Sequence, residues 1–273
     1  MTKPCKVSVI IPCFNHGEFV QEAVDSVSRV GRDDMELIVV DDGSTDERTR
    51  QEMNALSARG INVIRQDNKG LAGARNAGIS ASYGEYIFPL DADDRFRLGW
   101  TDKAIRLLDS DRKVGVVYGD AECFGIRTGR WRVGPFDAAR LLKENYIHCS
   151  ALYRRSVWEQ NHGYDGTMPV QGLEDWDFWL GAVEHGWKFA YISDIFFDYR
   201  KTAGSMITKA APFEEQIREF VARKHGVLYQ QAWESLVREH KSVKATSRNL
   251  GRLLKSRLKQ TLEKFKADGH AHR

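Results

Sequence analysis

The chain has 273 residues, of which 42% are hydrophobic and 11% aromatic, enough to fill the core of one large α/β domain or of two small ones. The net charge of +3 is unevenly distributed, because residues 241–273 hold ten Lys and Arg against two acidic residues and the rest of the chain is mildly acidic. An acidic body lacks the basic face of a nucleic-acid-binding domain, which excludes that class of partner for the folded part.

Residues 1–93 alternate short hydrophobic runs with amphipathic segments, which is typical of consecutive βαβ units. We expect an open, doubly wound, mostly parallel sheet with helices on both faces, whose ligands bind beyond the carboxyl ends of the strands. The predicted strands are 7–11, 37–40, 62–65 and 86–90, and the predicted helices between them are 18–29, 49–59 and 72–80.

The signals become mixed after residue 93. The expected elements are helices at 100–109, 137–144 and 175–185, strands at 114–118, 150–153 and 189–192, a hairpin-like stretch at 122–133, and two or more helices within 212–265. Pattern therefore specifies this part of the chain less completely than the first part.

The cysteines and the N-terminus bear on the compartment. The four cysteines lack the spacing of a disulfide framework or a metal site, which predicts small buried thiols in a reducing compartment, and no histidine has zinc-site spacing. The N-terminus has no apolar signal-peptide core, and no stretch approaches the roughly 18 apolar residues of a membrane span. We therefore expect a cytoplasmic protein. The four cysteines are Cys5, Cys13, Cys123 and Cys149.

A first acidic cluster, Asp41-Asp42-Gly43-Ser44, follows the predicted strand 37–40. Asp42 could accept the imide N–H of a uracil or thymine ring in a charge-assisted hydrogen bond, and Phe14, after the first strand, could stack on the base. The alternative is that the segment is only a turn with a helix cap, which its composition favours.

A second acidic cluster, Asp91-Ala92-Asp93-Asp94, follows the predicted strand 86–90. Asp91 and Asp93 are two residues apart, so in an extended segment they lie on one side and could hold Mg²⁺ or Mn²⁺ directly or through water. Such a cation would bridge the phosphates of a nucleotide sugar and neutralise the departing diphosphate. Acidic turns are common, but carboxylates at the end of a buried strand are costly to leave unpaired.

A third acidic pair, Glu174-Asp175, opens a Trp-rich helix, where the helix dipole favours the ionised carboxylate. A general base for a sugar hydroxyl must be ionised, and Asp175 meets this condition. The alternative is a helix cap with acidic residues in the first turn. Trp176 and Trp179 are interpreted either as core anchors or as a platform for an acceptor sugar.

Two arginines accompany the acidic clusters. Arg75, within the small-residue segment 68–78, could meet the phosphates or sugar of a donor or lock the aspartate clusters by an ion pair. Arg200, after Tyr199, could reach the leaving diphosphate or pair with a nearby acid at the surface.

Together these motifs resemble those of glycosyltransferase family 2, inverting enzymes with the GT-A fold. The matching segments occur in the family's order within residues 5–205 and are 7–15, 40–46, 68–70, 74–78, 84–87, 91–94 and 174–177. The resemblance implies Asp175 as the catalytic base and Asp91 and Asp93 as ligands of Mg²⁺ or Mn²⁺. The residues expected to bind the nucleotide or substrate are Pro12, Phe14, Asn15, Asp41, Asp42, Arg75, Asp91, Glu174 and Arg200.

The resemblance also implies the reaction. A sugar would pass from a nucleoside-diphosphate sugar, UDP by family habit, to a saccharide or lipid-linked acceptor in cell-surface polysaccharide or glycolipid synthesis, with inversion. Thr202 stands where many relatives carry a His after a Tyr-Arg pair, and the Gln-x-x-Arg-Trp motif of processive synthases is absent. We therefore expect the transfer of one sugar or a few.

Two other functions would use parts of this pattern. A nucleotidyltransferase-like enzyme also uses paired aspartates, but its Gly-rich loop after the first strand is missing from residues 12–17. A catalytically inactive nucleotide-sugar-binding protein would not need Asp42, Asp93 and Asp175 together. The predicted division is a catalytic domain over 1–210, with a nucleotide-binding half at 1–93 and an acceptor half at 94–210, followed by a basic helical extension at 211–273.

The extension carries leucines at every fourth position from Leu250 to Leu262, surrounded by basic residues. On a helix this pattern predicts either contact with an anionic membrane surface through 245–266, on the inner membrane face, or packing against the catalytic domain or a second subunit. No feature of the sequence specifies the oligomeric state.

Overall fold

The computed structural model describes residues 5–241. A first compact unit ends at His225, and residues 226–241 are helical and belong to a second unit. The predicted division at residues 93 and 210 stays a prediction. The leucine repeat and the predicted membrane contact through 245–266 lie outside the described residues.

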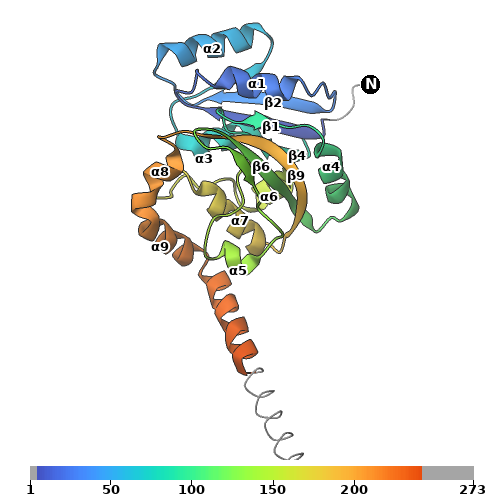
Figure 1. Ribbon diagram of the computed structural model, residues 1–273, viewed down its shortest axis with the longest axis vertical. Coiled ribbons are helices and arrows are strands. Elements are labelled where there is room, and N and C mark those ends of the chain that lie inside the picture. Colours follow the sequence, from blue (N-terminus) through green and yellow to red (C-terminus); the bar gives the residue numbers. More distant parts are fainter. Residues whose placement is uncertain (1–4, 242–273) are drawn as a thin grey trace, which may run out of the picture. The chain divides into compact units, whose positions relative to one another are not determined.

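The first unit alternates strands and helices along its first half (Figure 1). Its strands are β1 (Val7–Cys13), β2 (Met35–Asp41), β3 (Asn62–Arg65), β4 (Tyr86–Pro89), β5 (Arg95–Phe96), β6 (Val114–Gly125), β7 (Gly129–Trp131), β8 (Leu152–Arg154) and β9 (Lys188–Lys201). Its helices are α1 (Val20–Ser28), α2 (Glu47–Ala58), α3 (Gly70–Ser80), α4 (Thr101–Ser110), α5 (Ala138–Leu141), α6 (Arg155–Gln160), α7 (Glu174–Glu184), α8 (Met206–Ala210), the 3₁₀ helix η1 (Ala211–Phe213) and α9 (Glu214–Lys224).

All strands join one sheet in the order β3-β2-β1-β4-β8-β6-β9-β5, with β7 paired to β6. The four strands from β3 to β4 are parallel, β8 runs antiparallel between β4 and β6, and β6 and β9 are again parallel. The predicted mostly parallel sheet with helices on both faces is therefore confirmed. The carboxyl ends of β1, β2 and β4 lie at the same edge of the sheet, which is where the first two acidic clusters follow.

Every residue of β1 is buried, which shows that the sheet is covered on both sides at this strand. Val7, Val9 and Ile11 belong to a hydrophobic cluster that includes the buried valines of α1, whereas α3 lies on the opposite face (Figure 1). On that face Gly78 of α3 approaches so closely that a Cβ would lie 2.5 Å from Cγ2 of Ile10. Glycine at this position lets α3 lie near the sheet and brings Arg75 close to the strand ends.

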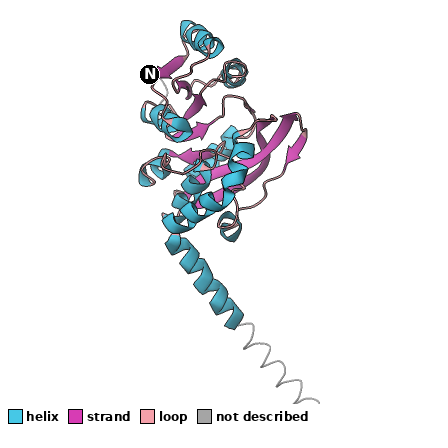
Figure 2. Cartoon of the chain, turned by 90° about the vertical axis from the view of Figure 1, so that its left-hand side faces the viewer, coloured by secondary structure: helices cyan, strands magenta, loops and turns pink. Residues whose placement is uncertain are grey.

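Strand β9 continues nine residues beyond its predicted end. Its hydrophobic run is interrupted at Ser193-Asp194, where the pairing with β6 shifts register between Gly119 and Ala121. Beyond this bulge the ladder resumes and extends to the pair Gly125–Lys201, visible as the long curved strands of Figure 2. Asp198, Tyr199 and Arg200 therefore lie within a strand, whereas the sequence placed them after one. The short elements β5 and α6 were not predicted.

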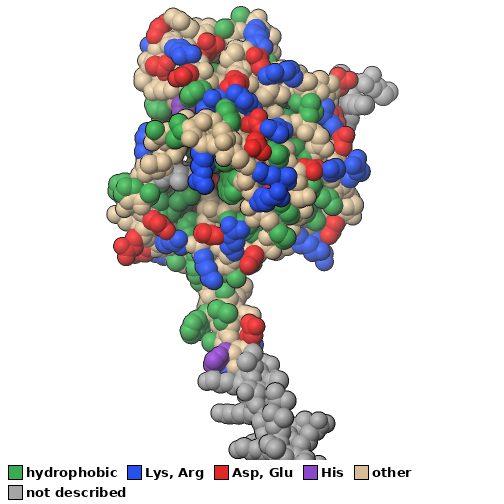
Figure 3. All heavy atoms as spheres, viewed as in Figure 1, with side chains coloured by type: hydrophobic (Ala, Val, Ile, Leu, Met, Phe, Trp, Pro, Cys, Tyr) green, Lys and Arg blue, Asp and Glu red, His purple; other side chains and the backbone are tan. Residues whose placement is uncertain are grey.

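The surface seen in Figure 3 carries Lys and Arg side chains interspersed with Asp and Glu side chains. Among the described residues, no helix is both long enough and apolar enough to cross a bilayer.

A buried histidine joins the last helix of the unit to α7. Nε2 of His225 lies 3.0 Å from Oδ1 of Asp177, and Nδ1 lies 3.0 Å from Oε2 of Glu184. Burial acts to lower the pKa of His225, but hydrogen bonds and charge interactions with the two carboxylates outweigh it and raise the pKa above the ordinary value. The end of α9 is thus held to the helix that carries Glu174 and Asp175.

We expect the unfolding free energy of this unit to depend on pH through His225. Because the folded state raises the pKa, the stabilisation is fully present below the ordinary value of about 6.5 and is lost as pH rises through the folded value. Thermal unfolding between pH 6 and pH 9 should therefore show a smaller loss of stability in His225→Gln than in the wild type. His185→Gln, at the exposed C-cap of α7, should follow the wild type. Parallel curves for the wild type and His225→Gln would contradict the prediction.

Candidate functional site

The first acidic cluster connects two strand ends with the loop before α3. The backbone N–H of Asp42 donates to the carbonyl of Cys13 at 2.9 Å, and Oδ1 of the buried Asp42 accepts from Nε2 of Gln66 at 2.6 Å and from the Lys69 N–H at 2.9 Å. Both bonds go to the same carboxylate oxygen. Asp41 instead accepts from the Ser44 N–H at 3.0 Å, so the predicted turn role is the observed one for Asp41.

The loop after β1 is clipped to the loop after β2 by Asn15. This residue has a φ of 54°, which asparagine tolerates, and its Oδ1 accepts from the N–H groups of Thr45 at 2.8 Å and Asp46 at 3.2 Å. Its neighbour Phe14 is 44% exposed, while Pro12 is buried within β1. The Phe14 ring is therefore partly open to solvent, whereas Asn15 bonds to backbone N–H groups, and the roles of both in nucleotide binding stay predictions.

Gly43 sets how closely these loops approach. Its φ is +73°, and a Cβ at this position would lie 2.7 Å from the backbone nitrogen of Asn68. Only glycine satisfies both conditions, so the loop before α3 can lie directly against the turn after β2.

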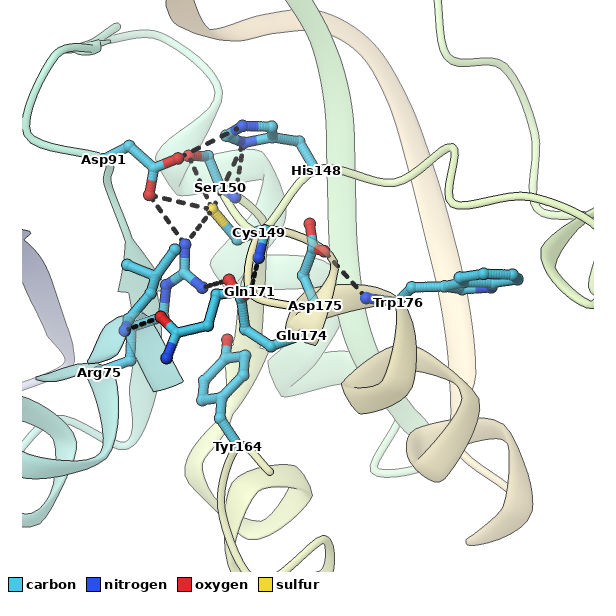
Figure 4. A network of polar contacts seen from close by, with 12 residues as sticks. Arg75, Asp91, His148, Cys149, Ser150, Tyr164, Gln171, Glu174, Asp175 and Trp176 are labelled. Carbon is cyan, nitrogen blue, oxygen red and sulfur yellow. Dashed lines mark hydrogen bonds and ion pairs between the residues drawn. The ribbon is translucent and has the colours of Figure 1, made fainter. Parts of the chain in front are cut away.

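Arg75 of α3 links the second acidic cluster to the third (Figure 4). Its side chain is 1% exposed, Nη2 lies 2.8 Å from Oδ1 of Asp91, and Nη1 pairs with Glu174. Nη2 also donates to Sγ of Cys149 at 3.1 Å. Glu174 is fixed further by the Gly172 N–H, which donates to its other oxygen at 2.8 Å. Of the two predicted uses of Arg75, the structure shows the ion pair that locks the aspartate clusters.

Asp91 also neighbours two residues that the sequence did not indicate. Nε2 of His148 lies 3.7 Å from its Oδ2 and Sγ of Cys149 lies 3.5 Å from its Oδ1, and the three side chains offer ligand atoms within 4.8 Å of one another. Burial, together with the charge of Arg75, lowers the pKa of His148 to about 4, so the imidazole is neutral. A thiol, an imidazole and a carboxylate suit a softer cation than Mg²⁺.

Arg200 holds the second acidic cluster to β9. Its N–H donates to Oδ1 of Asp94 and its Nε donates to the carbonyl of Asp93, both at 2.8 Å. Its guanidinium pairs with Glu22 and lies over the ring of Phe19 at 4.5 Å. The structure therefore shows the ion pair that was one of the two predicted uses of Arg200, and contact with a diphosphate stays a prediction.

The carboxylates of the second cluster are crowded. Burial, followed by the charge of Asp91, raises the pKa of Asp93, and burial with the charges of Asp93 and Asp91 raises that of Asp94. Oδ2 of Asp94 is buried without a hydrogen-bond partner among the described residues. The pKa of Asp91 is lowered instead, because Arg75 and His148 outweigh its burial. Excess negative charge on hard oxygen atoms fits a divalent cation such as Mg²⁺ or Mn²⁺.

Asp175 lies next to Glu174 in the first turn of α7. Its Oδ1 accepts from Nδ2 of Asn145 at 2.8 Å and from the Trp176 N–H at 2.9 Å. Burial, followed by the charge of Glu174, raises the pKa of Asp175 to about 8. Such a group is only about one-tenth ionised at pH 7 and reaches half ionisation near pH 8, and its ionised form can accept a proton from a bound hydroxyl.

The two tryptophans of α7 are core anchors. Both are buried, and their Nε1 groups donate to the carbonyls of Leu141 at 2.6 Å and Ile147 at 2.9 Å. The core role is thus the one the structure shows for Trp176 and Trp179.

The first cluster reaches the third through a loop contact. The N–H of Leu71, two residues after Lys69, donates to Oε1 of Gln171 at 2.8 Å, and Gln171 lies in the loop that leads to Glu174 (Figure 4). Gln66, Gln171, Asn145, His148 and Cys149 were missed because none stands in a patterned segment. They enter the site only through contacts across 24 to 100 residues of chain.

Residues 8–170 match the family described as Glycosyl transferase family 2. The chain belongs to this family. A relative named PGL/p-HBAD biosynthesis glycosyltransferase, from Mycobacterium bovis, is 31% identical over 63% of this chain and 67% of its own length. An uncharacterised glycosyltransferase of Nostoc sp. is 35% identical over 41% of this chain and 36% of its own. The chondroitin synthase of Pasteurella multocida is 25% identical over 69% of this chain, which spans only 20% of that synthase.

Solved structures confirm the predicted GT-A fold of this family 2 chain. S. aureus TarS 1–349 superposes on this chain with a TM-score of 0.63 at 20% identity. The superposition covers 82% of this chain and 65% of the TarS chain. The mannosyltransferase PcManGT from Pyrobaculum calidifontis, solved with GDP-Man and Mn²⁺, superposes with a TM-score of 0.55 at 22% identity. The superposition covers 76% of this chain and 60% of PcManGT. The recognised motifs and the fold thus agree.

We expect Arg75→Met to destabilise the folded unit by about 3–5 kcal/mol, because it leaves the carboxylates of Glu174 and Asp91 without their cation. Urea denaturation measures the difference. Arg50→Met, which removes an exposed pair with Glu47, is the matched control and should change stability by less than about 1 kcal/mol. Equal effects of the two substitutions would show that Arg75 does not hold the clusters together.

Proposed function

We propose that the protein is an inverting glycosyltransferase that moves a sugar from a nucleoside-diphosphate sugar, with UDP as the nucleotide, to a hydroxyl of a saccharide or lipid-linked acceptor. The observation that carries this proposal is the Arg75 guanidinium, which ties Asp91 on the donor side to Glu174 beside Asp175. Relatives named for PGL/p-HBAD biosynthesis and for chondroitin synthesis support a role in glycolipid or cell-surface polysaccharide synthesis.

The nucleoside would bind at the ends of β1 and β2. Gln66 and the Lys69 N–H both bond to Oδ1 of Asp42, which leaves Oδ2 to accept the imide N–H of uracil. The exposed ring of Phe14 offers a face for the base. A structure of TarS with UDP, at 20% identity, supports this choice of nucleotide for the fold.

The diphosphate would lie over the second acidic cluster. Asp93, with Asp91, would hold Mg²⁺ or Mn²⁺, since the crowded carboxylates need a positive charge and Asp93 has no basic side chain paired to it among the described ion pairs. When bound, the cation supplies charge neutralisation of the departing diphosphate. Arg75 orients Asp91 through the hydrogen bond of 2.8 Å from its Nη2 to Oδ1.

The chemical step is a single displacement. Oδ2 of Asp175 takes the proton of the acceptor hydroxyl while that oxygen forms a bond to the anomeric carbon. The bond from the anomeric carbon to the diphosphate oxygen breaks, and the diphosphate leaves with the electron pair. Attack from the face opposite the leaving group inverts the anomeric configuration. Asp175 must be ionised at the start and ends protonated.

We expect a UDP-sugar to raise the melting temperature of the wild type when UDP-, GDP- and dTDP-sugars are compared with Mn²⁺ or Mg²⁺ present. The reason is that a ligand bound only to the folded state stabilises it. Two substitutions should then separate binding from chemistry. Asp93→Ala should lose the metal-dependent part of this rise. Asp175→Asn should keep it but lose donor hydrolysis and transfer by about 10²- to 10⁴-fold. Full transfer by Asp175→Asn would identify another base, and no response to any donor would refute the donor class.

We expect the rate of donor hydrolysis to rise with pH on its acid side and to level off above about pH 8. The pKa of Asp175 is raised to about 8, and only the ionised form can accept a proton. The measurement is kcat/KM for a UDP-sugar between pH 5.5 and pH 9, which reports groups of the free enzyme. Residual hydrolysis by Asp175→Asn should lack this rise, and a wild-type profile that is flat across the range would contradict the assignment.

A further inference from the structure

We propose that Asn145 is a positioning residue for the base: together with the Trp176 N–H it fixes Oδ1 of Asp175 and leaves Oδ2 to receive the proton. This inference rests on the proposed function, since it assigns a role in the same reaction. The hydrogen bond that the Asn145 side chain makes among the described residues goes to Asp175, so it acts through that carboxylate.

The two hydrogen bonds converge on one carboxylate oxygen. Nδ2 of Asn145 donates to Oδ1 of Asp175 at 2.8 Å, and the Trp176 N–H donates to the same atom at 2.9 Å. A carboxylate whose Oδ1 accepts from two directions cannot rotate freely about its Cβ–Cγ bond. The lone pairs of Oδ2 therefore keep one direction, which a base for an in-line displacement requires.

The segment that carries Asn145 is clamped to α7 on both sides. Nε1 of Trp176 donates to the carbonyl of Leu141, four residues before Asn145, and Nε1 of Trp179 donates to the carbonyl of Ile147, two residues after it. Both indoles are buried. The distance between the Asn145 amide and Asp175 is thus set by two additional hydrogen bonds between the same two segments.

The cost of this arrangement points to function. Oδ1 of Asn145 is buried without a hydrogen-bond partner among the residues that the structure describes. An unsatisfied buried carbonyl destabilises the folded state, and an apolar residue of similar size would avoid that penalty. The orientation with Nδ2 toward Asp175 is the one that an ionised carboxylate favours, because the opposite orientation would face two acceptors toward each other.

The charged and titratable groups around Asp175 explain why it needs a donor. Burial and Glu174 raise its pKa most, Asp91 adds to this, and Arg75 acts in the opposite direction. Cys149, from the segment after α5, and Tyr199, from β9, also lie within electrostatic range. A hydrogen bond donated to the carboxylate stabilises the ionised form and opposes the acids. Removing Nδ2 of Asn145 should therefore raise the pKa further.

The test compares two asparagines that both donate to α7. Nδ2 of Asn161 bonds to the carbonyl of Phe178 at 2.8 Å, and its Oδ1 is likewise buried without a partner among the described residues. Asn145→Leu and Asn161→Leu each remove one side-chain amide that donates a hydrogen bond to α7, but only the first removes a donor to Asp175. Asn145→Ala serves if the leucine variant fails to fold.

The pKa of Asp175 is measured directly by ¹³C NMR of carboxyl-labelled aspartate, assigned by the signal missing from Asp175→Asn. We expect a higher pKa in Asn145→Leu than in the wild type and an unchanged pKa in Asn161→Leu. With UDP-sugar as the probe, hydrolysis at pH 7 should fall about three- to tenfold in Asn145→Leu, with the KM for the donor unchanged and the acid limb moved to higher pH.

An unchanged pKa in both the leucine and alanine variants at position 145, or equal shifts in the variants at 145 and 161, would overturn the inference. The titration is independent of turnover. A shifted pKa in a protein that hydrolyses no nucleotide sugar would refute the proposed function while supporting the contact between Asn145 and Asp175.

Discussion

A buried guanidinium between two carboxylates organises this protein. Arg75 is almost fully enclosed, and a single charged group in that position would be strongly unfavourable. Its Nη groups instead meet Asp91 and Glu174, so that the loss of hydration is offset by two ion pairs. The geometry of a guanidinium, planar and donating in two directions, joins α3, the loop after β4 and the start of α7 in one fixed arrangement. This contact sets the distance between the second and third acidic clusters.

The same contact distributes charge unevenly among the acids. Asp91 is kept ionised because Arg75 outweighs its burial, while Asp93, Asp94 and Asp175 experience burial and like charges and have raised pKa values. Carboxylates whose pKa values differ in this way can take different roles, one as an ionised anchor and one as a proton acceptor. An excess of acid at the strand ends is also what a divalent cation would balance.

Local pattern was sufficient for the first half of the fold. Hydrophobic runs separated by amphipathic segments predicted β1 to β4 and the helices between them, and parallel strands bring their following acids to one edge of the sheet. The pattern failed at β9, because Ser193-Asp194 interrupts the hydrophobic run at a bulge that only the pairing with β6 reveals. It also missed β5 and α6, which are too short to have a period of their own.

The sequence by itself determined the family, the GT-A fold and which acidic clusters belong together, since each motif is a contiguous run of residues at the end of a predicted element. Only the tertiary structure decided what each side chain touches. In the folded chain Arg200 pairs with Glu22, and His148 and Cys149 lie beside Asp91. Asn145 donates a hydrogen bond to Asp175. The physical reason is that hydrogen bonds and ion pairs depend on distances of about 3 Å between atoms, which the packing of helices on a sheet sets. Residues 30 to 178 apart in the chain meet here without a signal in either segment.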